Sequence, residues 1–247
     1  MAVVCITGST DGIGLSATRL LLDEGHSVLV HARTEDRGRP VVDELRSRGD
    51  VRLVVGDLSD LEQVGDLADA IDRVDVLVHN AGVFPKEPGS TSAQGYELAF
   101  AVNVLAPSVL TMLLAERIGQ RLVFLGSGMA GSGRIDPDGL GTATDPKRAY
   151  SDSKALDVLL ALAWARRLPG LTVGAVDPGW VGTKLATPGA PGDVASGGRR
   201  VAAAATGDWT GGYTAGRRAA RTPAALQDEA LQDRVLEALD GMARRTA

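Results

Sequence analysis

Gly8-Ser9-Thr10-Asp11-Gly12-Ile13-Gly14 is the stretch that decides the fold of this 247-residue chain. It follows the apolar run 2–6 and precedes residues 15–22, where apolar side chains recur at helical spacing. Residues without a Cβ let a backbone turn sharply and let a diphosphate approach it, and the following helix offers unpaired N–H groups to the anion. On these residues alone, a phosphate cradle and a plain loop between strand and helix are equally good interpretations.

The composition indicates a soluble globular protein that forms one domain over residues 1–247. Hydrophobic residues make up 44% and charged residues 23% of the chain, a balance typical of a folded α/β domain. The net charge of −5 and the pI near 5.3 argue against nucleic acid or an anionic membrane as the main partner. We therefore expect no nucleic-acid and no membrane partner.

Cysteine and histidine usage argues against disulfides and metal. Cys5 is the single cysteine, so no internal disulfide can form. His26, His31 and His79 are scattered without ligand spacing, so we expect all three to be structural and no metal site. The longest apolar run, 158–165, is too short to span a bilayer and no basic leader precedes the first strand, which predicts a cytoplasmic protein.

Continuous apolar runs predict the strands of a sheet, at residues 2–6, 27–31, 51–55, 74–78, 122–125, 171–176 and 211–215. Runs that do not alternate are typical of parallel strands buried on both faces. Helical patterns separate them, at residues 15–22, 34–49, 61–71, 92–118, 146–168 and 223–243. We therefore expect an α/β Rossmann fold with a doubly wound, mostly parallel sheet of about seven strands. Residues 128–146 predict a loop, and 189–198 the most mobile segment.

Small or polar residues directly follow six of the predicted strands. Ligands of an open parallel sheet bind outside the carboxyl ends of its strands, so these positions are candidates for function. Any one of them alone is more often an ordinary strand end. The candidates are Gly8, Arg33, Asp57, Asn80, Ser127 and the pair Pro178-Gly179.

Tyr150 and Lys154 form the most discriminating pair, because a spacing of four places both on one face of a helix. The same stripe continues through apolar residues, so the lysine stands in a mostly apolar row. An ammonium near a phenol favours the phenolate, which lowers the phenol pKa and provides an acid/base group usable near neutral pH. An ordinary surface pair is the competing interpretation.

Asn103 is unusual because its neighbours on every face of the helix, residues 99–106, are apolar. A buried amide is costly unless it is hydrogen-bonded. It could cap a broken helical turn or hold a polar network, and on its own the first interpretation is favoured.

Taken together, these positions resemble the short-chain dehydrogenase/reductase family over nearly the whole chain. The family's motif T-G-x-x-x-G-x-G matches Thr7 to Gly14, and its N-A-G matches Asn80-Ala81-Gly82. Its Y-x-x-x-K matches Tyr150 to Lys154, and its P-G-x-V-x-T matches Pro178-Gly179-Trp180-Val181-Gly182-Thr183. Its helix asparagine and active-site serine match Asn103 and Ser127. Six matches in order make the phosphate cradle the better interpretation of the glycine turn.

The likeness is greatest to the retinol-dehydrogenase-like branch. It rests on the long interval from Ser127 to Tyr150, on the Gly133-Arg134-Ile135 within it, and on Asp177 to Val181 followed by Thr183-Lys184. Gly128 departs from the family, which usually has a small polar or aliphatic residue there.

The resemblance implies hydride transfer between a nicotinamide cofactor and a carbonyl or alcohol substrate. It implies that Tyr150 protonates the nascent alkoxide and that Lys154 lowers the tyrosine pKa and hydrogen-bonds the nicotinamide ribose. It also implies that Ser127 donates to the substrate oxygen and that Asn103 positions a water linking Lys154 to solvent.

The end of the second strand predicts NADP(H). An NAD-preferring site normally has an acidic residue there for the ribose 2′-OH, whereas this chain has Arg33, which suits a 2′-phosphate. Asp57 and Leu58 are expected to border the adenine, and Val181 and Thr183 to meet the carboxamide. The full set expected to bind cofactor is Gly8, Ser9, Thr10, Asp11, Gly12, Ile13, Gly14, Arg33, Asp57, Leu58, Asn80, Ala81, Gly82, Tyr150, Lys154, Pro178, Gly179, Val181 and Thr183.

Apolar residues beside the strand ends suggest an apolar or aromatic carbonyl substrate. A sugar-nucleotide epimerase or dehydratase of the related extended family is one alternative, but few residues follow Thr183 to build its larger substrate domain. A non-catalytic dinucleotide-binding regulator is another, and the intact Ser127, Tyr150 and Lys154 argue against it. Family members often associate through the helices of Asn103 and Tyr150, so a homo-oligomer is compatible with the sequence. The expected pocket residues are Val83, Phe84, Met129, Ile135, Leu140, Trp180 and Leu185.

Overall fold

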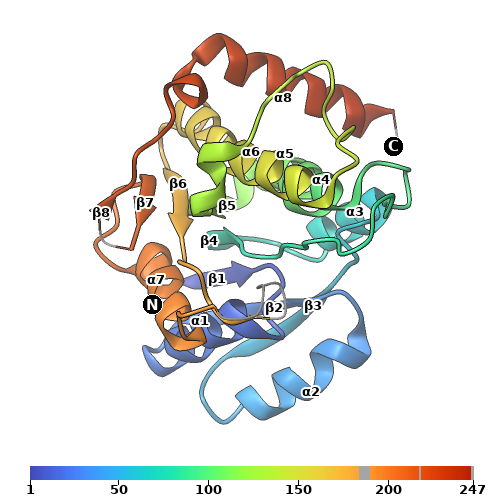
Figure 1. Ribbon diagram of the computed structural model, residues 1–247. Coiled ribbons are helices and arrows are strands. Elements are labelled where there is room, and N and C mark those ends of the chain that lie inside the picture. The colour runs from blue at the N-terminus through green and yellow to red at the C-terminus, as the bar shows by residue number, and fades with distance from the viewer. Residues whose placement is uncertain (184–189, 217, 246–247) are drawn as a thin grey trace.

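The computed structural model describes residues 1–183, 190–216 and 218–245, and this described part is built on one eight-stranded sheet (Figure 1). The strand order is β3-β2-β1-β4-β5-β6-β7-β8. All neighbouring strands are parallel except β7 and β8. The strands are β1 (Val3–Ile6), β2 (Ser27–Ala32), β3 (Val51–Val55), β4 (Val74–His79), β5 (Ile118–Leu125), β6 (Thr172–Asp177), β7 (Gly212–Ala215) and β8 (Arg218–Ala219).

The predicted Rossmann fold with a doubly wound, mostly parallel sheet is confirmed. The expectation of about seven strands misses one, because β8 has only two residues and no apolar run marks it. The chain winds from β1 toward β3 and then returns to β4 on the other side of β1. This reversal creates the switch point beside which ligands of such sheets bind.

Helices cover both faces of the sheet, and each face has its own apolar core. One core is formed with α1 (Gly12–Asp23), α2 (Glu35–Leu45) and α7 (Val194–Thr206). The other is formed with α3 (Leu61–Asp69), α4 (Leu98–Phe100), α5 (Ala106–Leu114), α6 (Pro146–Arg167) and α8 (Glu229–Arg244).

Helix α8 lies on the outside of α5 and α6, on the side away from the sheet (Figure 1). Its apolar side Val235, Leu236 and Leu239 is buried in the core of that face. Arg166 of α6 binds the carboxylate of Asp233 on α8 through both terminal nitrogens, each at 3.3 Å. The helix is therefore tied to α6 by apolar contacts and by surface ion pairs.

The helix predicted at residues 92–118 begins later, at Leu98, because Glu97 forms an isolated bridge with Thr91 and caps the backbone N–H groups of Ala99 and Phe100. It continues through a π-helical turn, Ala101–Leu105, to α5 and a 3₁₀ turn, Ala115–Arg117. By length and composition Leu98–Arg117 could cross a membrane, but 78% of its apolar window is buried inside the protein. Such burial is typical of a core helix, and Asn103 divides its apolar residues into shorter runs.

Helix α7 was not predicted. The segment 189–198 was expected to be mobile, but Val194 already begins this helix, and residue 189 lies outside the described residues. A Cβ on Gly198 would lie 2.3 Å from Ser16 Oγ, and one on Gly197 would lie 3.0 Å from Ile13 Cγ1. The glycines that suggested mobility are thus required for the close packing of α7 against α1.

Two further boundaries differ from expectation. The predicted loop 128–146 contains a 3₁₀ helix, Gly128–Ser132, directly after β5, and the predicted last helix 223–243 is divided into a 3₁₀ turn, Ala224–Gln227, and α8. Helix α6 agrees closely with its prediction, because Asp145 caps it and Pro146 occupies its first turn.

Candidate active site

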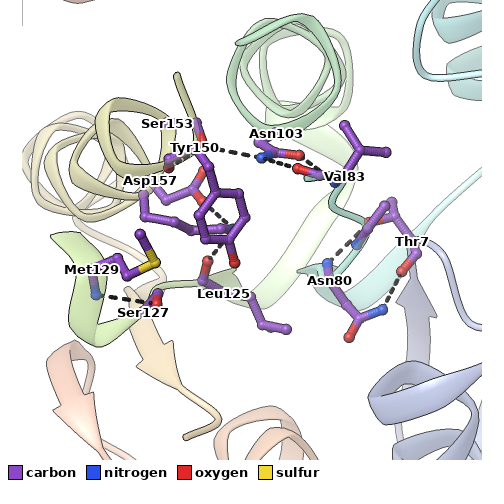
Figure 2. Close-up of polar contacts among 12 residues, drawn as sticks. Thr7, Asn80, Val83, Asn103, Leu125, Ser127, Met129, Tyr150, Ser153 and Asp157 are labelled. Atoms are coloured by element: carbon purple, nitrogen blue, oxygen red, sulfur yellow. Dashed lines mark hydrogen bonds and ion pairs between the residues drawn. The ribbon is translucent and has the colours of Figure 1, made fainter. Parts of the chain in front are cut away.

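The site lies at the carboxyl ends of β1, β4, β5 and β6, where the predicted motifs meet. Figure 2 shows Tyr150 and Ser127 on one side of this region and Thr7 and Asn80 on the other. The first pair comes from α6 and the end of β5, and the second from the ends of β1 and β4. Motifs more than 100 residues apart in the chain are thus placed on one edge of the sheet.

The glycine turn after β1 needs its glycines for two reasons. Gly8 and Gly12 have φ angles of 62° and 55°, in the left-handed region that side chains disfavour. A Cβ on Gly8 would also lie 2.9 Å from Ala81 Cα, and one on Gly14 would lie 2.5 Å from Asn80 Nδ2. The turn is therefore narrow, and it leads directly into the N-terminus of α1.

Asn80 clamps this turn from the neighbouring strand. Its Nδ2 donates to the carbonyls of Thr7 at 2.7 Å and Gly8 at 3.1 Å, and the backbone N–H groups of Asn80 and Ala81 both donate to Thr7 Oγ1 at 3.0 Å (Figure 2). These bonds join the T-G and N-A-G motifs into one unit, in which each fixes the position of the other.

Two buried side chains support the turn from behind. Ser9 Oγ donates to the Ile6 carbonyl at 2.8 Å and accepts from the His31 N–H at 3.1 Å, so any cofactor contact of Ser9 must come from its backbone. His31 Nδ1 accepts from the Gly8 N–H at 2.9 Å, which leaves Nε2 to donate to the Gly56 carbonyl at 2.8 Å. Burial lowers the pKa of His31, so the ring stays neutral in this role. His31 is structural, as expected, but what it supports is the cradle.

Ser127 follows β5 and caps the 3₁₀ helix that begins at Gly128. Its Oγ accepts from the Met129 N–H at 3.2 Å, and its hydroxyl proton can still be donated to a ligand. Its carbonyl accepts from the Tyr213 hydroxyl at 2.9 Å. Burial raises the pKa of Tyr213 to about 12, which keeps that hydroxyl protonated as a donor. No sequence pattern indicated that Tyr213 fixes Ser127 in place.

Tyr150 and Lys154 lie on one face of α6, as the spacing predicts. Lys154 Nζ is 5.7 Å from the centre of the Tyr150 ring. The Phe84 ring packs against the same tyrosine with a centroid separation of 4.8 Å and an interplanar angle of 53°. The ammonium thus stands close enough to stabilise the phenolate, and Phe84 makes the surroundings of the phenol partly apolar.

Lys154 is buried and has a carboxylate partner that sequence reasoning missed. Its Nζ donates to Asp157 Oδ2 at 2.7 Å and to the Leu125 carbonyl at 3.0 Å. Burial raises the pKa of Asp157 to about 6, although the Lys154 ammonium acts to lower it. For Lys154, burial acts to lower the pKa, but the Asp157 carboxylate, the Tyr150 phenol group and the Asp177 carboxylate together outweigh it and the pKa is raised. An acidic residue three positions after the lysine was the signal that could have revealed the pair.

Asn103 holds a polar network and does not cap a helix end, so the favoured expectation was wrong. Its Oδ1 accepts from the Val83 N–H at 2.8 Å, and its Nδ2 donates to the Val83 carbonyl at 3.1 Å and to Ser153 Oγ at 2.9 Å (Figure 2). Ser153 in turn donates to the Tyr150 carbonyl at 2.8 Å. The network joins the N-A-G loop to α6, and a π-helical turn, with no break, carries the asparagine.

The expected adenosine end lies where β2 and β3 finish. Arg33 Nε is 4.0 Å from Asp57 Oδ2, and 61% of the arginine side chain is exposed. Asp57 Oδ1 accepts from the N–H and the hydroxyl of Ser59, at 2.9 and 2.7 Å. Leu58 is buried. Arg33 is thus held loosely and can turn to meet a ligand.

The segment after β6 comes back to the glycine turn. Gly179 has a φ of 88°, and its N–H donates to Asp177 Oδ1 at 2.7 Å. Val181 is buried and forms an isolated bridge with Gly192. A Cβ on Gly12 would lie 3.5 Å from Thr183 Cγ2, so the first and last cofactor motifs face each other.

The expected substrate pocket is only partly supported. Phe84 contacts Tyr150, and the Trp180 side chain, which follows Gly179, is exposed. Leu140 is buried in the apolar core of the face that α5 and α6 cover, so little of its side chain is exposed to a ligand. Leu185 lies outside the described residues.

Comparison with known proteins finds similarity to one family over most of the chain. The model of the family described as short chain dehydrogenase matches residues 2–192. The short-chain dehydrogenase chyC of Penicillium rubens is 34% identical, covering 97% of this chain and 96% of its own. A putative daunorubicin C-13 ketoreductase of a Streptomyces species is 34% identical over 74% of this chain and 67% of its own, and human retinol dehydrogenase 13 is 32% identical over 74% and 60%.

Solved structures share the fold. A protein from Mycobacterium paratuberculosis has a TM-score of 0.87 and 26% identity, covering 99% of this chain and 94% of its own. A blue fluorescent protein from a metagenomic library, in complex with NADPH, has a TM-score of 0.70 and 25% identity over 88% of this chain and 98% of its own.

Proposed function

Because this chain belongs to the short-chain dehydrogenase/reductase family, an oxidoreductase family acting on CH–OH groups with a nicotinamide dinucleotide, we propose an NADP(H)-dependent carbonyl reductase/alcohol dehydrogenase with Tyr150 as its general acid and base. The observation that carries the proposal is the placement of Tyr150 beside the buried Lys154 ammonium, at the same sheet edge as Ser127. A phenol with a cation 5.7 Å from its ring is suited to exchange a proton with a substrate oxygen.

Three residues of the chain act around the substrate oxygen, each in a different role. When bound, the nicotinamide ring supplies the hydride in reduction and accepts it in oxidation. Ser127 donates a hydrogen bond to the substrate oxygen, where negative charge develops during reduction. Tyr150 gives its proton to that oxygen, and Lys154 stabilises the phenolate that results. In oxidation the phenolate takes the proton back from the alcohol.

The glycine turn fits a dinucleotide. A Cβ on Gly8 or Gly14 would fill the narrow cradle, and the N-terminus of α1 begins within the turn, at Gly12. Backbone N–H groups at a helix N-terminus attract phosphate oxygens. Asn80 and Thr7 hold this geometry without charge. The cofactor phosphates are therefore expected to bind to backbone N–H groups of the turn and to charged side chains farther from it.

Arg33 supports NADP(H) over NAD(H). It stands at the end of β2 where an NAD-preferring site carries an acid, and most of its side chain is exposed. A guanidinium can bind a 2′-phosphate with two parallel hydrogen bonds. The blue fluorescent protein of similar fold was solved with NADPH, which agrees with this choice.

An apolar or aromatic carbonyl compound is the proposed substrate class. Phe84 against the phenol ring offers a flat apolar surface next to the reacting groups, and exposed Trp180 beside Gly179 offers another after the end of β6. A relative described as a ketoreductase supports reduction as the direction to test first. Beyond Thr183, the described chain returns to the sheet as α7, β7, β8 and α8, and forms no separate substrate domain of the kind expected for an epimerase.

The experiment is to follow NADPH consumption with a panel of aldehydes and ketones for wild type, Tyr150→Phe and Tyr96→Phe. Removal of the proton donor is expected to lower turnover by about 10³-fold while NADPH still binds. Tyr96 packs edge-on against Phe100, with ring centroids 6.2 Å apart, and lies outside the predicted site set, so its variant is expected to match wild type. Residual wild-type rates in Tyr150→Phe would place the proton donor elsewhere.

The same panel separates the alternatives. NADPH binding without turnover of any carbonyl compound would favour a regulator. Isomerisation of a sugar nucleotide without net NADPH consumption would favour an epimerase. Turnover restricted to small polar ketones would overturn the proposed apolar substrate.

A further inference from the structure

The Lys154–Asp157 pair is a feature that the proposed mechanism does not use. Lys154 is 5% exposed and Asp157 is 3% exposed, and their charged atoms are 2.7 Å apart. The spacing of three places both on one face of α6. The Leu125 carbonyl at the end of β5 accepts a second hydrogen bond from the same ammonium. Two of the three N–H donors of Lys154 are therefore bound inside the protein.

Stability alone does not explain this pair. Removing two charges from water is costly, and apolar side chains of similar size often replace a buried ion pair without loss of stability. The neighbours Ala155, Leu156 and Val158 are all buried and apolar, so another apolar residue would suit position 157. The carboxylate instead lies against the lysine that acts on Tyr150, which indicates a role at the site.

We propose that Asp157 is a positioning residue that holds the Lys154 ammonium against the end of β5 and sets how strongly this ammonium stabilises the Tyr150 phenolate. The inference rests on the proposed function, in which Tyr150 exchanges the proton. Asp157 reaches the reaction through Lys154 and has no substrate contact of its own.

The sign of the effect follows from the charges around Lys154. On its own helix the ammonium faces the Asp157 carboxylate and the Tyr150 phenol, and the Asp177 carboxylate acts on it from the end of β6. Tyr213 on β7 stands near Asp177 and stays protonated. Each carboxylate keeps the lysine protonated, but each also offsets part of the positive field at the phenol. When the Asp157 charge is removed, the Asp177 carboxylate still acts to keep Lys154 protonated, so the less compensated ammonium should make Tyr150 lose its proton more readily.

The test is a direct titration of Tyr150, because phenolate formation changes ultraviolet absorption and the chain has three tyrosines. The signal of Tyr150 is obtained by subtracting the curve of Tyr150→Phe from that of the parent protein, and by subtracting Tyr150→Phe/Asp157→Asn from Asp157→Asn. Asparagine keeps the shape and an acceptor oxygen but removes the charge. We expect the midpoint to move to lower pH by about one unit. This readout requires neither substrate nor turnover.

Matched variants separate a tuning role from general damage. Asp152→Asn removes a carboxylate on the same helix, one that binds the Arg148 side chain and the Arg134 N–H. The titration midpoint of Tyr150 in this variant should stay at the wild-type value. Asp157→Glu keeps the charge and should lie closer to wild type than Asp157→Asn does. Asp157→Ala introduces no clash and replaces the asparagine variant if that variant does not fold. Circular dichroism melts confirm that each variant is folded.

The outcomes decide the proposal. A lower midpoint in the neutral variants, with the alkaline limb of alcohol oxidation moving the same way, supports it. An unchanged or higher midpoint overturns it, and so does failure of both neutral variants to fold, which would make the pair purely structural. Turnover without a shift would remove Asp157 from the mechanism and leave the proposed function standing. A shift of the Tyr150 midpoint without turnover of any carbonyl compound would support the role of Asp157 and contradict the proposed function.

Discussion

The cofactor side and the proton-transfer side of the site are held together by different kinds of groups. The cradle around Gly8 is held by neutral groups, namely backbone amides, Asn80, Thr7 and the uncharged ring of His31. The proton-transfer side on α6 holds a buried ammonium and a buried carboxylate within 2.7 Å of each other. Asp11 within the turn caps α1 through the Gly12 N–H, so the shape of the cradle is set by backbone and side-chain hydrogen bonds, whereas the α6 side controls protonation through its charges. The comparison predicts that geometry governs the first side and charge governs the second.

The largest effect should come from adding one methyl group to the cradle. Gly8→Ala forces a side chain into the left-handed region, at about 1–2 kcal/mol, and against Ala81. We expect the NADPH dissociation constant to rise by about 100-fold, measured by fluorescence titration, with a lower melting temperature. Gly65→Ala in α3 is the control, because nothing lies within 4 Å of its added Cβ and alanine favours a helix. If both variants bind alike, the cradle does not depend on close packing.

The next effect tests the Arg33 guanidinium, which the cofactor side presents at the end of β2. Arg33→Asp should lower the ratio of catalytic efficiencies with NADPH and NADH by about 30-fold, since it removes a charge-assisted contact to the 2′-phosphate. Arg46→Ala, on the far end of α2 where the arginine pairs with Asp43, should leave the ratio unchanged. An unaltered ratio in Arg33→Asp would mean that the 2′-phosphate is recognised elsewhere.

The smallest effect concerns acid, to which the two sides respond with opposite signs. Burial lowers the pKa of His79, beside the cradle, to about 3. Its unfolded form binds a proton first, so stability is complete above pH 6.5 and falls by about 1.4 kcal/mol for each pH unit below it. Denaturant titrations at pH 7.5 and 5.5 should show a smaller loss for His79→Gln than for wild type. His26→Gln, which changes a partly buried ring, should retain the wild-type loss.

Asp157 should oppose this trend. Its pKa is raised above that of an unfolded aspartate, so its ionisation weakens the folded state as pH rises through about 6, and acid relieves that penalty. Asp157→Asn should therefore lose more stability between pH 7.5 and 5.5 than wild type in the same titrations. A smaller loss in the variant would mean that ionised Asp157 stabilises the folded state.

The sequence predicted those parts of the site whose chemistry is local. The glycine turn, the Tyr150–Lys154 spacing and the polar strand ends each follow from a short pattern and a known periodicity. Asn103 was misjudged because its partners Val83 and Ser153 lie 20 and 50 residues away, and no local pattern records such pairs. Helix α7 was missed because Gly197 and Gly198 oppose helix formation locally, while packing against α1 requires them.

Helix α8 changes what the face formed by α5 and α6 can do. In the folded chain this face is already occupied by a segment of the same molecule, held by Leu236, Leu239 and the Arg166–Asp233 contacts. A second copy that bound to the same face would have to displace α8. Because α8 belongs to the same chain, its effective concentration at this face is on the order of millimolar. Association through α5 and α6 is thereby coupled to the detachment of α8, and its cost is the free energy of undocking one helix.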